Sequence, residues 1–265
     1  MTSRRLDLAA AGFSEGGRYE RARPGYGADA VDALCGHLGI GPGVRVLDLA
    51  AGTGKLTREL VDRGADVVAV ELVAGMRDQL VAALPAVRVL TGAAESLPLE
   101  DGEVEVITVA QAFHWFDGPR AIGEIHRVLR PGGRLGLLWN VMDLSVAWVA
   151  TIHEIIHRHR GASPWYAGHG WSSAFAGSRA FGDLAHEAFR NAQPMDMEGL
   201  LDRVSSISFI GTLPPQARRD VLDDVAAAVV REGVPDRDGR FAFPYVTDIF
   251  WCARLDAEGG DAAPA

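Results

Sequence analysis

Short apolar runs alternate with amphipathic stretches from residue 44 onward, and this alternation limits the chain to few folds. Five runs have the length and composition of buried strands, at residues 44–49, 66–70, 87–90, 104–110 and 135–139. Stretches with helical spacing lie between most of them, at residues 55–63, 74–84 and 119–129. Parallel strands require crossover helices, so the pattern predicts an α/β fold with a doubly wound, mainly parallel sheet.

The segments on either side of this core also have recognisable patterns. We expect helices at residues 28–38, 144–160 and 214–231, and a last, antiparallel strand at residues 241–253. Residues 161–195 show no clear period but contain several aromatic side chains, so we expect an α-helical and aromatic insert after strand five that acts as a lid.

Composition and charge exclude several classes of protein. The chain has 265 residues, of which 48% are hydrophobic and 23% charged, as in a globular domain and unlike a disordered chain. Its net charge of -9 and the lack of a basic run argue against nucleic acid as a partner. The two cysteines lie far apart and indicate neither a disulfide framework nor a CxxC metal site. No apolar run approaches the ~18 residues that span a bilayer, so we expect a soluble, cytoplasmic protein with no membrane partner.

A loop of small residues, from Asp48 to Gly54, joins the first predicted strand to a helix. Three classes of nucleotide ligand bind at such a junction, because the backbone can be approached closely there and the helix N-terminus has unpaired N–H groups. A P-loop is excluded, since its first glycine is missing and Leu56 replaces its hydroxyl residue. A dinucleotide fingerprint is weak, because Ala50 and Lys55 stand at two of its three glycine positions. NAD therefore stays an alternative, and the third class is S-adenosyl-L-methionine (SAM).

The loop and three later features resemble the class I SAM-dependent methyltransferases. Residues 46–54 resemble motif I of that superfamily, and Glu71, 23 residues after Asp48, matches the acidic residue that binds the two ribose hydroxyls. Residues 92–98 resemble its adenine-contacting segment, and residues 124–133 resemble the helix and turn before its fifth strand. The resemblance implies a Rossmann-like fold. It also implies a cofactor site formed by Asp48, Ala50, Gly52, Glu71, Met76, Ala94, Glu95 and Gln111.

Two further segments are similar to a narrower group, the methyltransferase type 11 or trans-aconitate methyltransferase-like subfamily. They are residues 19–26 and residues 110–116. The resemblance implies that Tyr19 and Arg23 bind the methionine carboxylate of the cofactor, for which a phenol and a guanidinium are suitable donors. The chain departs from the general pattern at Ala50, where motif I usually has a glycine.

Four aromatic side chains are candidates for the acceptor side of the site. His114 follows the central strand, where open α/β sheets bind ligands, and is a candidate general base or acceptor-orienting residue. Trp115, Trp139 and Trp165 are candidates to bind the substrate. Each has a plain alternative, because aromatic side chains at strand ends are often simply part of the core. Gln111, likewise, is either a ligand contact or a surface amide.

One motif indicates different chemistry. His153, Glu154 and His157 satisfy HExxH, which on a helix places two imidazoles on one face for zinc, with the glutamate as general base. The sequence defines no third zinc ligand beyond the guesses Glu187 and His169. Zinc proteases with this motif also do not have a doubly wound parallel sheet. We therefore predict no metal and interpret the motif as a solvated helix face.

Together these features predict a SAM-dependent methyltransferase that methylates a small-molecule acceptor and releases S-adenosyl-L-homocysteine (SAH). O-methylation of a carboxylate or hydroxyl is favoured over N- or C-methylation. The alternatives are an NAD-binding oxidoreductase and a SAM-fold protein without transferase activity, and monomer and homodimer both stay open. The predicted division is an N-terminal helical segment at the cofactor site (1–43), a SAM-binding core (44–140), a helical lid and acceptor insert (141–213), a C-terminal helix and closing strand (214–255) and a flexible tail (256–265).

Overall fold

Seven strands form one sheet in the computed structural model, which describes residues 25–161, 163, 166 and 170–256. The strands are β1 (Arg45–Leu49), β2 (Asp66–Val70), β3 (Arg88–Leu90), β4 (Val104–Ala110), β5 (Leu129–Met142), β6 (Ala185–Asp196) and β7 (Arg240–Ala253). Their order across the sheet is β3-β2-β1-β4-β5-β7-β6. Neighbours from β3 to β5 are parallel, whereas β7 runs against both β5 and β6. The predicted Rossmann-like sheet with an antiparallel last strand is confirmed.

Helices cover both faces of the parallel part of the sheet, because successive side chains of a strand point to opposite faces. Val46 and Leu138 belong to the apolar cluster on one face, with α3 and α4, and Ile107 and Leu137 to the cluster on the other, with α6. The elements of this half are α3 (Ala28–Leu38), α4 (Lys55–Asp62), α5 (Ala74–Ala83), α6 (Gly118–Val128) and the 3-10 turns η1 (Phe113–Trp115) and η3 (Gly170–Ala174). The carboxyl edge of β1, β2 and β4 is left for the site.

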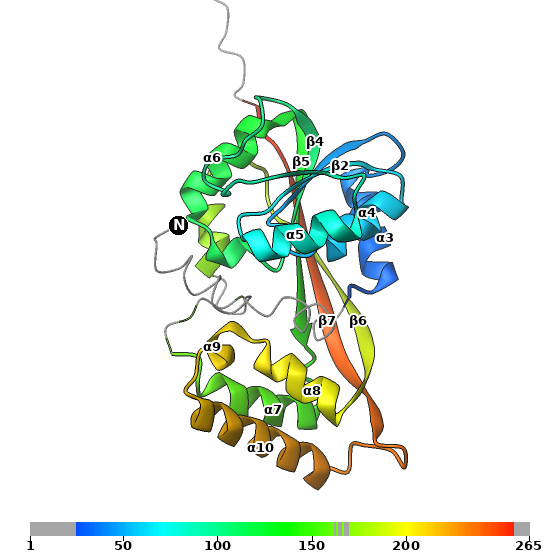
Figure 1. The fold of residues 1–265 in the computed structure, drawn as a ribbon. Coiled ribbons are helices and arrows are strands. Elements are labelled where there is room, and N and C mark those ends of the chain that lie inside the picture. The colour runs from blue at the N-terminus through cyan, green and yellow to red at the C-terminus, as the bar shows by residue number, and fades with distance from the viewer. Residues whose placement is uncertain (1–24, 162, 164–165, 167–169, 257–265) are drawn as a thin grey trace, which may run out of the picture.

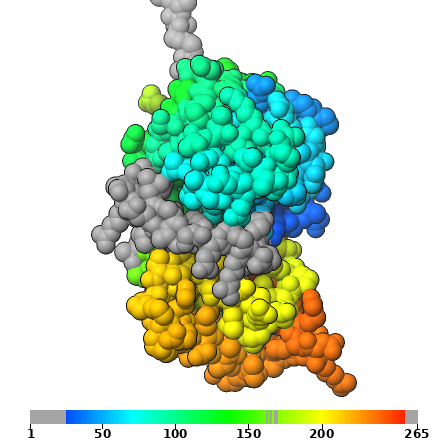
Figure 2. Space-filling view, in the orientation of Figure 1, coloured from blue at the N-terminus to red at the C-terminus, as the bar shows by residue number. Residues whose placement is uncertain are grey.

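Strands β5, β7 and β6 are longer than the others and continue into a second, helical half of the molecule (Figure 1). That half contains α7 (Ala147–His157), α8 (Met197–Ser205), α9 (Ser208–Gly211) and α10 (Pro215–Arg231). Its core forms where these helices meet the far ends of the strands, at residues such as Phe243 and Tyr245, which are fully buried. Figure 2 shows the sheet half in cyan and green and the helical half in yellow and orange.

The edge strand β6 was not predicted. Residues 161–195 were expected to belong to an α-helical and aromatic insert, yet they include nearly all of β6 (Ala185–Asp196). The strand pairs only with β7, and most of its side chains are exposed or half-buried. It therefore lacks the apolar alternation that marks a buried strand, and it contains Pro194, which is tolerated at a sheet edge. Part of the predicted insert thus belongs to the main sheet.

Helices α8 and α9 were not predicted as separate elements, and the remaining differences concern element boundaries. Helix α7 begins at Ala147 and not at residue 144, because Asp143 first forms a turn in which its carboxylate accepts hydrogen bonds from the amide and hydroxyl of Ser145. The predicted turn at residues 131–133 lies within β5, as an irregularity in its pairing with β4. Of the helices in the described ranges, none is both long and apolar enough to cross a membrane.

Candidate cofactor and acceptor site

Two residues at the ends of neighbouring strands have backbone conformations that side chains rarely adopt. Ala50 follows β1 with a φ of 57°, and Gln111 follows β4 with a φ of 60°. Among the described residues, only these two combine a side chain with a positive φ. Because β1 and β4 are adjacent and parallel, both lie at the same carboxyl edge of the sheet. Strain of this kind, about 1 kcal/mol or more at each residue, is concentrated at ligand-binding positions.

A cleft opens at this edge of the sheet. Its empty space, open mouth included, is about 1240 Å³. Of the eight predicted cofactor residues that the structure describes, seven form part of the wall: Asp48, Ala50, Gly52, Glu71, Met76, Ala94 and Gln111.

Glu71 follows β2 and connects two loops of the cleft. Its side chain is buried, with Oε2 accepting a hydrogen bond from the Gly52 amide at 2.8 Å and Oε1 accepting one from the Val73 amide at 2.7 Å. Burial raises the pKa of Glu71, and the amides of Val73 and Gly52 oppose that rise. Each carboxylate oxygen has a second lone pair, so Glu71 can also accept hydrogen bonds from two ligand hydroxyls.

Asp48 makes its hydrogen bonds inside the protein. The residue is 1% exposed, its Oδ2 accepts from the Thr57 hydroxyl at 2.6 Å, and its Oδ1 accepts from the Thr108 hydroxyl at 3.1 Å. Burial raises the pKa of Asp48 to about 6, although the two threonine hydroxyls act to lower it. Asp48 therefore ties β1 to helix α4 and strand β4, and its contact with a cofactor stays a prediction.

The raised pKa of Asp48 predicts a pH-dependent stability. Between its ordinary pKa of 3.8 and about 6, the folded state binds more protons at Asp48 than the unfolded state does. The contribution of Asp48 to the free energy of unfolding therefore falls as the pH rises through this window, by about 3 kcal/mol in all. Asp48→Asn has no carboxyl group at this position and so lacks this loss. In urea denaturation from pH 4 to 8, the free energy of unfolding of the variant should therefore increase relative to that of the wild type. Asp62→Asn, at an exposed position of α4, should leave the wild-type profile in place. A constant difference between Asp48→Asn and the wild type would contradict the assignment.

Glu95 lies behind the wall of the cleft, next to Ala94. It is buried, and its Oε1 accepts a hydrogen bond from the Asp117 amide at 2.8 Å, at the start of α6. Ala94 itself forms part of the wall. The structure thus joins the predicted adenine-contacting segment to α6 through Glu95, and places Ala94 nearer to a ligand than Glu95.

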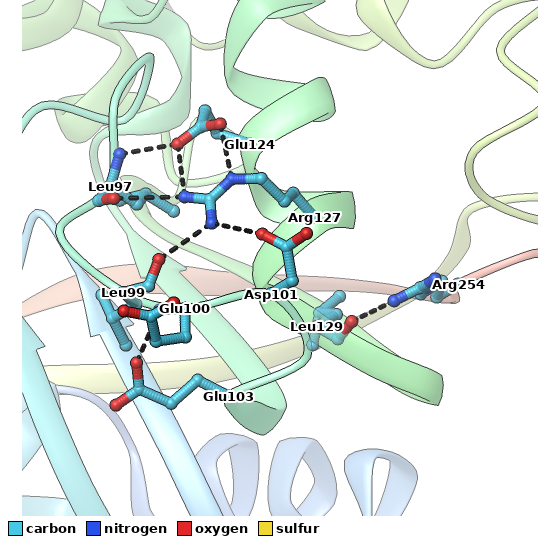
Figure 3. A network of polar contacts seen from close by, with 9 residues as sticks. All are labelled: Leu97, Leu99, Glu100, Asp101, Glu103, Glu124, Arg127, Leu129 and Arg254. Carbon is cyan, nitrogen blue, oxygen red and sulfur yellow. Dashed lines mark hydrogen bonds and ion pairs between the residues drawn. The ribbon is translucent and has the colours of Figure 1, made fainter.

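Arg127 of α6 holds the loop that follows Ala94 and Glu95, and Figure 3 shows its contacts. Its Nε and Nη2 donate to the two oxygens of Glu124 at 2.8 Å each, and Nη1 donates to Asp101 at 2.8 Å. The same guanidinium donates to the carbonyls of Leu97 at 3.1 Å and Leu99 at 2.8 Å. The hydrogen bonds that Arg127 donates to Glu124 lower the pKa of this carboxyl group. We name Arg127 the clamp of the adenine loop, which is the loop that the sequence predicts to contact adenine, and it fixes the backbone next to Ala94.

His114 lies in η1 beside the cleft but is not part of its wall. The Trp139 indole N–H donates to His114 Nδ1 at 3.3 Å. An indole nitrogen only donates, so Nδ1 is unprotonated and the proton of the neutral imidazole is on Nε2. In this tautomer Nε2 is a donor and not a base. This tautomer argues against the role of general base, and orientation of the acceptor stays a prediction.

The three predicted tryptophans have different positions. Trp115 forms part of the wall of the cleft. Trp139 is fully buried and packs against Tyr166 and Trp171, with ring centroids 4.6 Å away in both cases. It belongs to the core and is not part of the wall of the cleft, contrary to the prediction. Trp165 lies outside the described residues, so its role stays a prediction.

Comparisons with known proteins agree with this geometry. A family model for the methyltransferase domain matches residues 47–137. An uncharacterized methyltransferase of Mycobacterium tuberculosis is 41% identical over 249 residues, which cover 93% of this chain and 97% of the relative. This chain belongs to the class I SAM-dependent methyltransferases. An uncharacterized methyltransferase-like protein of Schizosaccharomyces pombe is 36% identical over 217 residues, 80% of this chain and 84% of that protein. A solved structure from Anaeromyxobacter dehalogenans, described as a candidate type II methyltransferase, has the same fold, with a TM-score of 0.66, 22% identity and coverage of 89% of this chain and 99% of that one.

The wall of the methyltransferase cleft also contains residues that the sequence did not indicate. They include Asn140 and Arg203. Asn140, at the end of β5, donates from Nδ2 to the Gly25 carbonyl at 2.7 Å and accepts from the hydroxyl of Thr247. In the sequence, Asn140 directly follows the predicted strand at residues 135–139, and this position could have marked it as a site residue. No local pattern marks Arg203, which comes to the cleft from α8.

The N-terminal prediction is only partly covered by the described residues. Tyr19 and Arg23, which by resemblance reach the methionine carboxylate of the cofactor, lie outside them. Gly25 and Tyr26 are described, the first bound to Asn140 and the second in the wall of the cleft. The N-terminal segment therefore contributes to the cleft of the methyltransferase, while the roles of Tyr19 and Arg23 stay predictions.

The HExxH motif lies on α7 of the methyltransferase, in the helical half. The rings of His153 and His157 stack with centroids 5.0 Å apart, and burial together with His157 lowers the pKa of His153. Glu187, one guessed third ligand, instead pairs with His37 at 3.0 Å. The other guess, His169, lies outside the described residues, and within them no three potential ligands come together at a metal site.

Proposed function

We propose that this methyltransferase transfers the methyl group of SAM to an oxygen atom of a small-molecule acceptor. The observation that carries the cofactor part is the position of Glu71, whose carboxylate lies at the carboxyl edge of β2 and is fixed by the amides of Gly52 and Val73. A fixed, buried carboxylate beside a small-residue loop is suited to two ribose hydroxyls.

The residues of the cleft suit the parts of SAM. Glu71 would hold the ribose, Ala94 and Met76 would contact the adenine, and Ala50 and Gln111 would present backbone to the methionine part. SAM, when bound, supplies an electrophilic methyl group on a sulfonium. When an acceptor oxygen bonds to the methyl carbon, the bond from that carbon to sulfur breaks, its electron pair stays on sulfur, and SAH is the product. The protein has to align the two molecules and keep water out.

The acceptor side of the cleft favours a small molecule. Trp115, Phe116 and Ala112 give this part of the wall an apolar surface. A net charge of -9 disfavours nucleic-acid acceptors, which need clustered basic residues. A carboxylate acceptor would need no general base, which agrees with the donor tautomer of His114.

Ligand-dependent melting tests this proposal against its rivals. The purified chain is heated alone and with SAM, SAH, NAD or zinc chloride. We expect SAH and SAM to raise the melting temperature by several degrees at 100 times their Kd, because they bind only the folded state. Stabilisation by NAD and not by SAH would support an oxidoreductase, and stabilisation by zinc alone would support a metal site at His153 and His157. Either result would overturn the proposal.

The proposed orienting role of His114 gives a further prediction. His114→Ala should leave the Kd of SAH, measured by calorimetry, nearly unchanged, because His114 is not in the wall of the cleft. Turnover on an acceptor should fall about 100-fold, the usual cost of a small misalignment. His114→Gln, which keeps a donor near the position of Nε2, should recover part of the rate. If His114→Gln is as slow as His114→Ala and the wild-type rate rises with pH, the residue is a base.

A further inference from the structure

Arg203 is a buried residue whose guanidinium has two nitrogens, Nε and Nη1, with no hydrogen-bond partner in the described ranges. It lies in α8, is 7% exposed, and forms part of the wall of the cleft. Its Nε and Nη1 atoms are buried and donate no hydrogen bond within the described part of the chain. Figure 1 shows that α8 lies on the side of the helical half that is nearest to the sheet half. Arg203 thus comes to the cleft from the helical half, whereas the glycine loop belongs to the sheet half.

An arrangement of this kind is costly unless a ligand completes it. Arginine stays charged in proteins, and a buried charge without hydrogen bonds destabilises a fold by several kcal/mol. Other buried charged groups of the cleft are satisfied internally, as Asp48 is by Thr57 and Thr108 and Glu71 by two amides. Arg203 differs from them because its Nε and Nη1 donate to no residue that the structure describes, so a ligand anion is the natural partner.

We propose that Arg203 binds a carboxylate group of the methyl acceptor. This inference rests on the proposed function and adds the chemical class of the acceptor. The family model for the methyltransferase domain matches residues 47–137, and members of the family share SAM as their cofactor. Arg203 lies outside this shared segment. A residue from the helical half therefore suits the acceptor better than SAM.

The chemistry of the site favours a carboxylate over other anions. A guanidinium offers parallel N–H donors that match the two oxygens of a carboxylate. Arg203 supplies a single positive charge, which neutralises a carboxylate completely but leaves a phosphate monoester with excess negative charge in a buried place. The neighbouring wall at Trp115 and Phe116 is apolar and suits the carbon skeleton of an organic acid.

Matched pairs of simple probes test the proposal. The chain is saturated with SAH, and its melting temperature is measured with benzoate, glutarate or tricarballylate and with the corresponding amides. Inorganic phosphate is a further probe. Each titration is repeated on Arg203→Met, on Arg203→Lys and on Arg231→Met, which removes an exposed charge from the same half.

We expect at least one acid to stabilise the SAH complex more than its amide does. Arg203→Met should weaken the binding of that acid at least tenfold. Arg203→Lys should weaken this binding less, and Arg231→Met should leave it unchanged. Without probes, Arg203→Met should melt at or above the wild type, because it removes an unpaired buried charge and keeps most of the volume.

Several results would overturn the proposal. They are equal stabilisation by acids and amides, a preference for phosphate, and a ligand-free melting temperature of Arg203→Met lowered by more than about 5 °C, which would mean that the guanidinium supports the fold. Loss of SAH binding in Arg203→Met would assign the residue to the carboxylate of the cofactor. Failure of SAH to stabilise the wild type would instead contradict the proposed function.

Discussion

Glu71→Ala is expected to weaken SAH binding at least tenfold. The buried Glu71 carboxylate is held by the Gly52 and Val73 amides, and in the proposed complex it also accepts hydrogen bonds from the ribose. Hydrogen bonds to a charged group contribute about 1.5–3 kcal/mol each, and loss of one of them gives a tenfold change or more. Calorimetric titration of SAH into both proteins measures the difference.

Two further variants separate ligand contact from loop support. Glu71→Gln keeps one oxygen for the Gly52 amide but loses the charge, so we expect an intermediate Kd. Glu154→Ala removes an exposed carboxylate from α7 and should leave the Kd of SAH unchanged. An unchanged Kd in Glu71→Ala would mean that the ribose binds elsewhere. Chemical denaturation of ligand-free Glu71→Ala shows whether the loop itself has lost stability.

Arg127→Met is expected to lower the free energy of unfolding by about 3 kcal/mol, because five hydrogen bonds of the clamp are lost at once and Glu124 keeps a half-buried charge without its cation. Methionine preserves the apolar stem of the side chain, so the loss reports on the guanidinium. Urea denaturation of the ligand-free protein is the measurement. We also expect weaker SAH binding, since the clamp fixes the backbone beside Ala94.

A surface ion pair in the same region is the matched control for the clamp. Arg88 pairs with Glu103 at 3.0 Å, and the arginine side chain is 56% exposed. Arg88→Met should therefore cost only about 0.5 kcal/mol. Equal losses in the two variants would show that Arg127 is one more surface ion pair and that the adenine loop does not depend on it.

Most of the parallel sheet could be predicted because its signals are local. Runs such as residues 104–110 are apolar on both faces, which is required of a strand covered by helices. The glycine loop and Glu71 could be placed in one site because parallel strands bring their carboxyl ends to the same edge.

What could not be predicted depends on contacts between distant parts of the chain. The exposed strand β6 needs no apolar pattern, because β7 supplies its hydrogen bonds. Arg203 is one of many arginines, and only the packing of α8 into the core of the helical half brings it to the cleft. Trp139 has the position of a ligand contact along the sequence, but Tyr166 and Trp171 enclose it.

The φ of 57° at Ala50 has a consequence for the entropy of ligand binding. A glycine there would sample several backbone conformations in the free protein and would lose them when the ligand arrives. Alanine has fewer conformations to lose, and its strain is already overcome when the chain folds. The loop of this methyltransferase is therefore ordered for its ligand beforehand, so that less of the binding free energy is spent on ordering it.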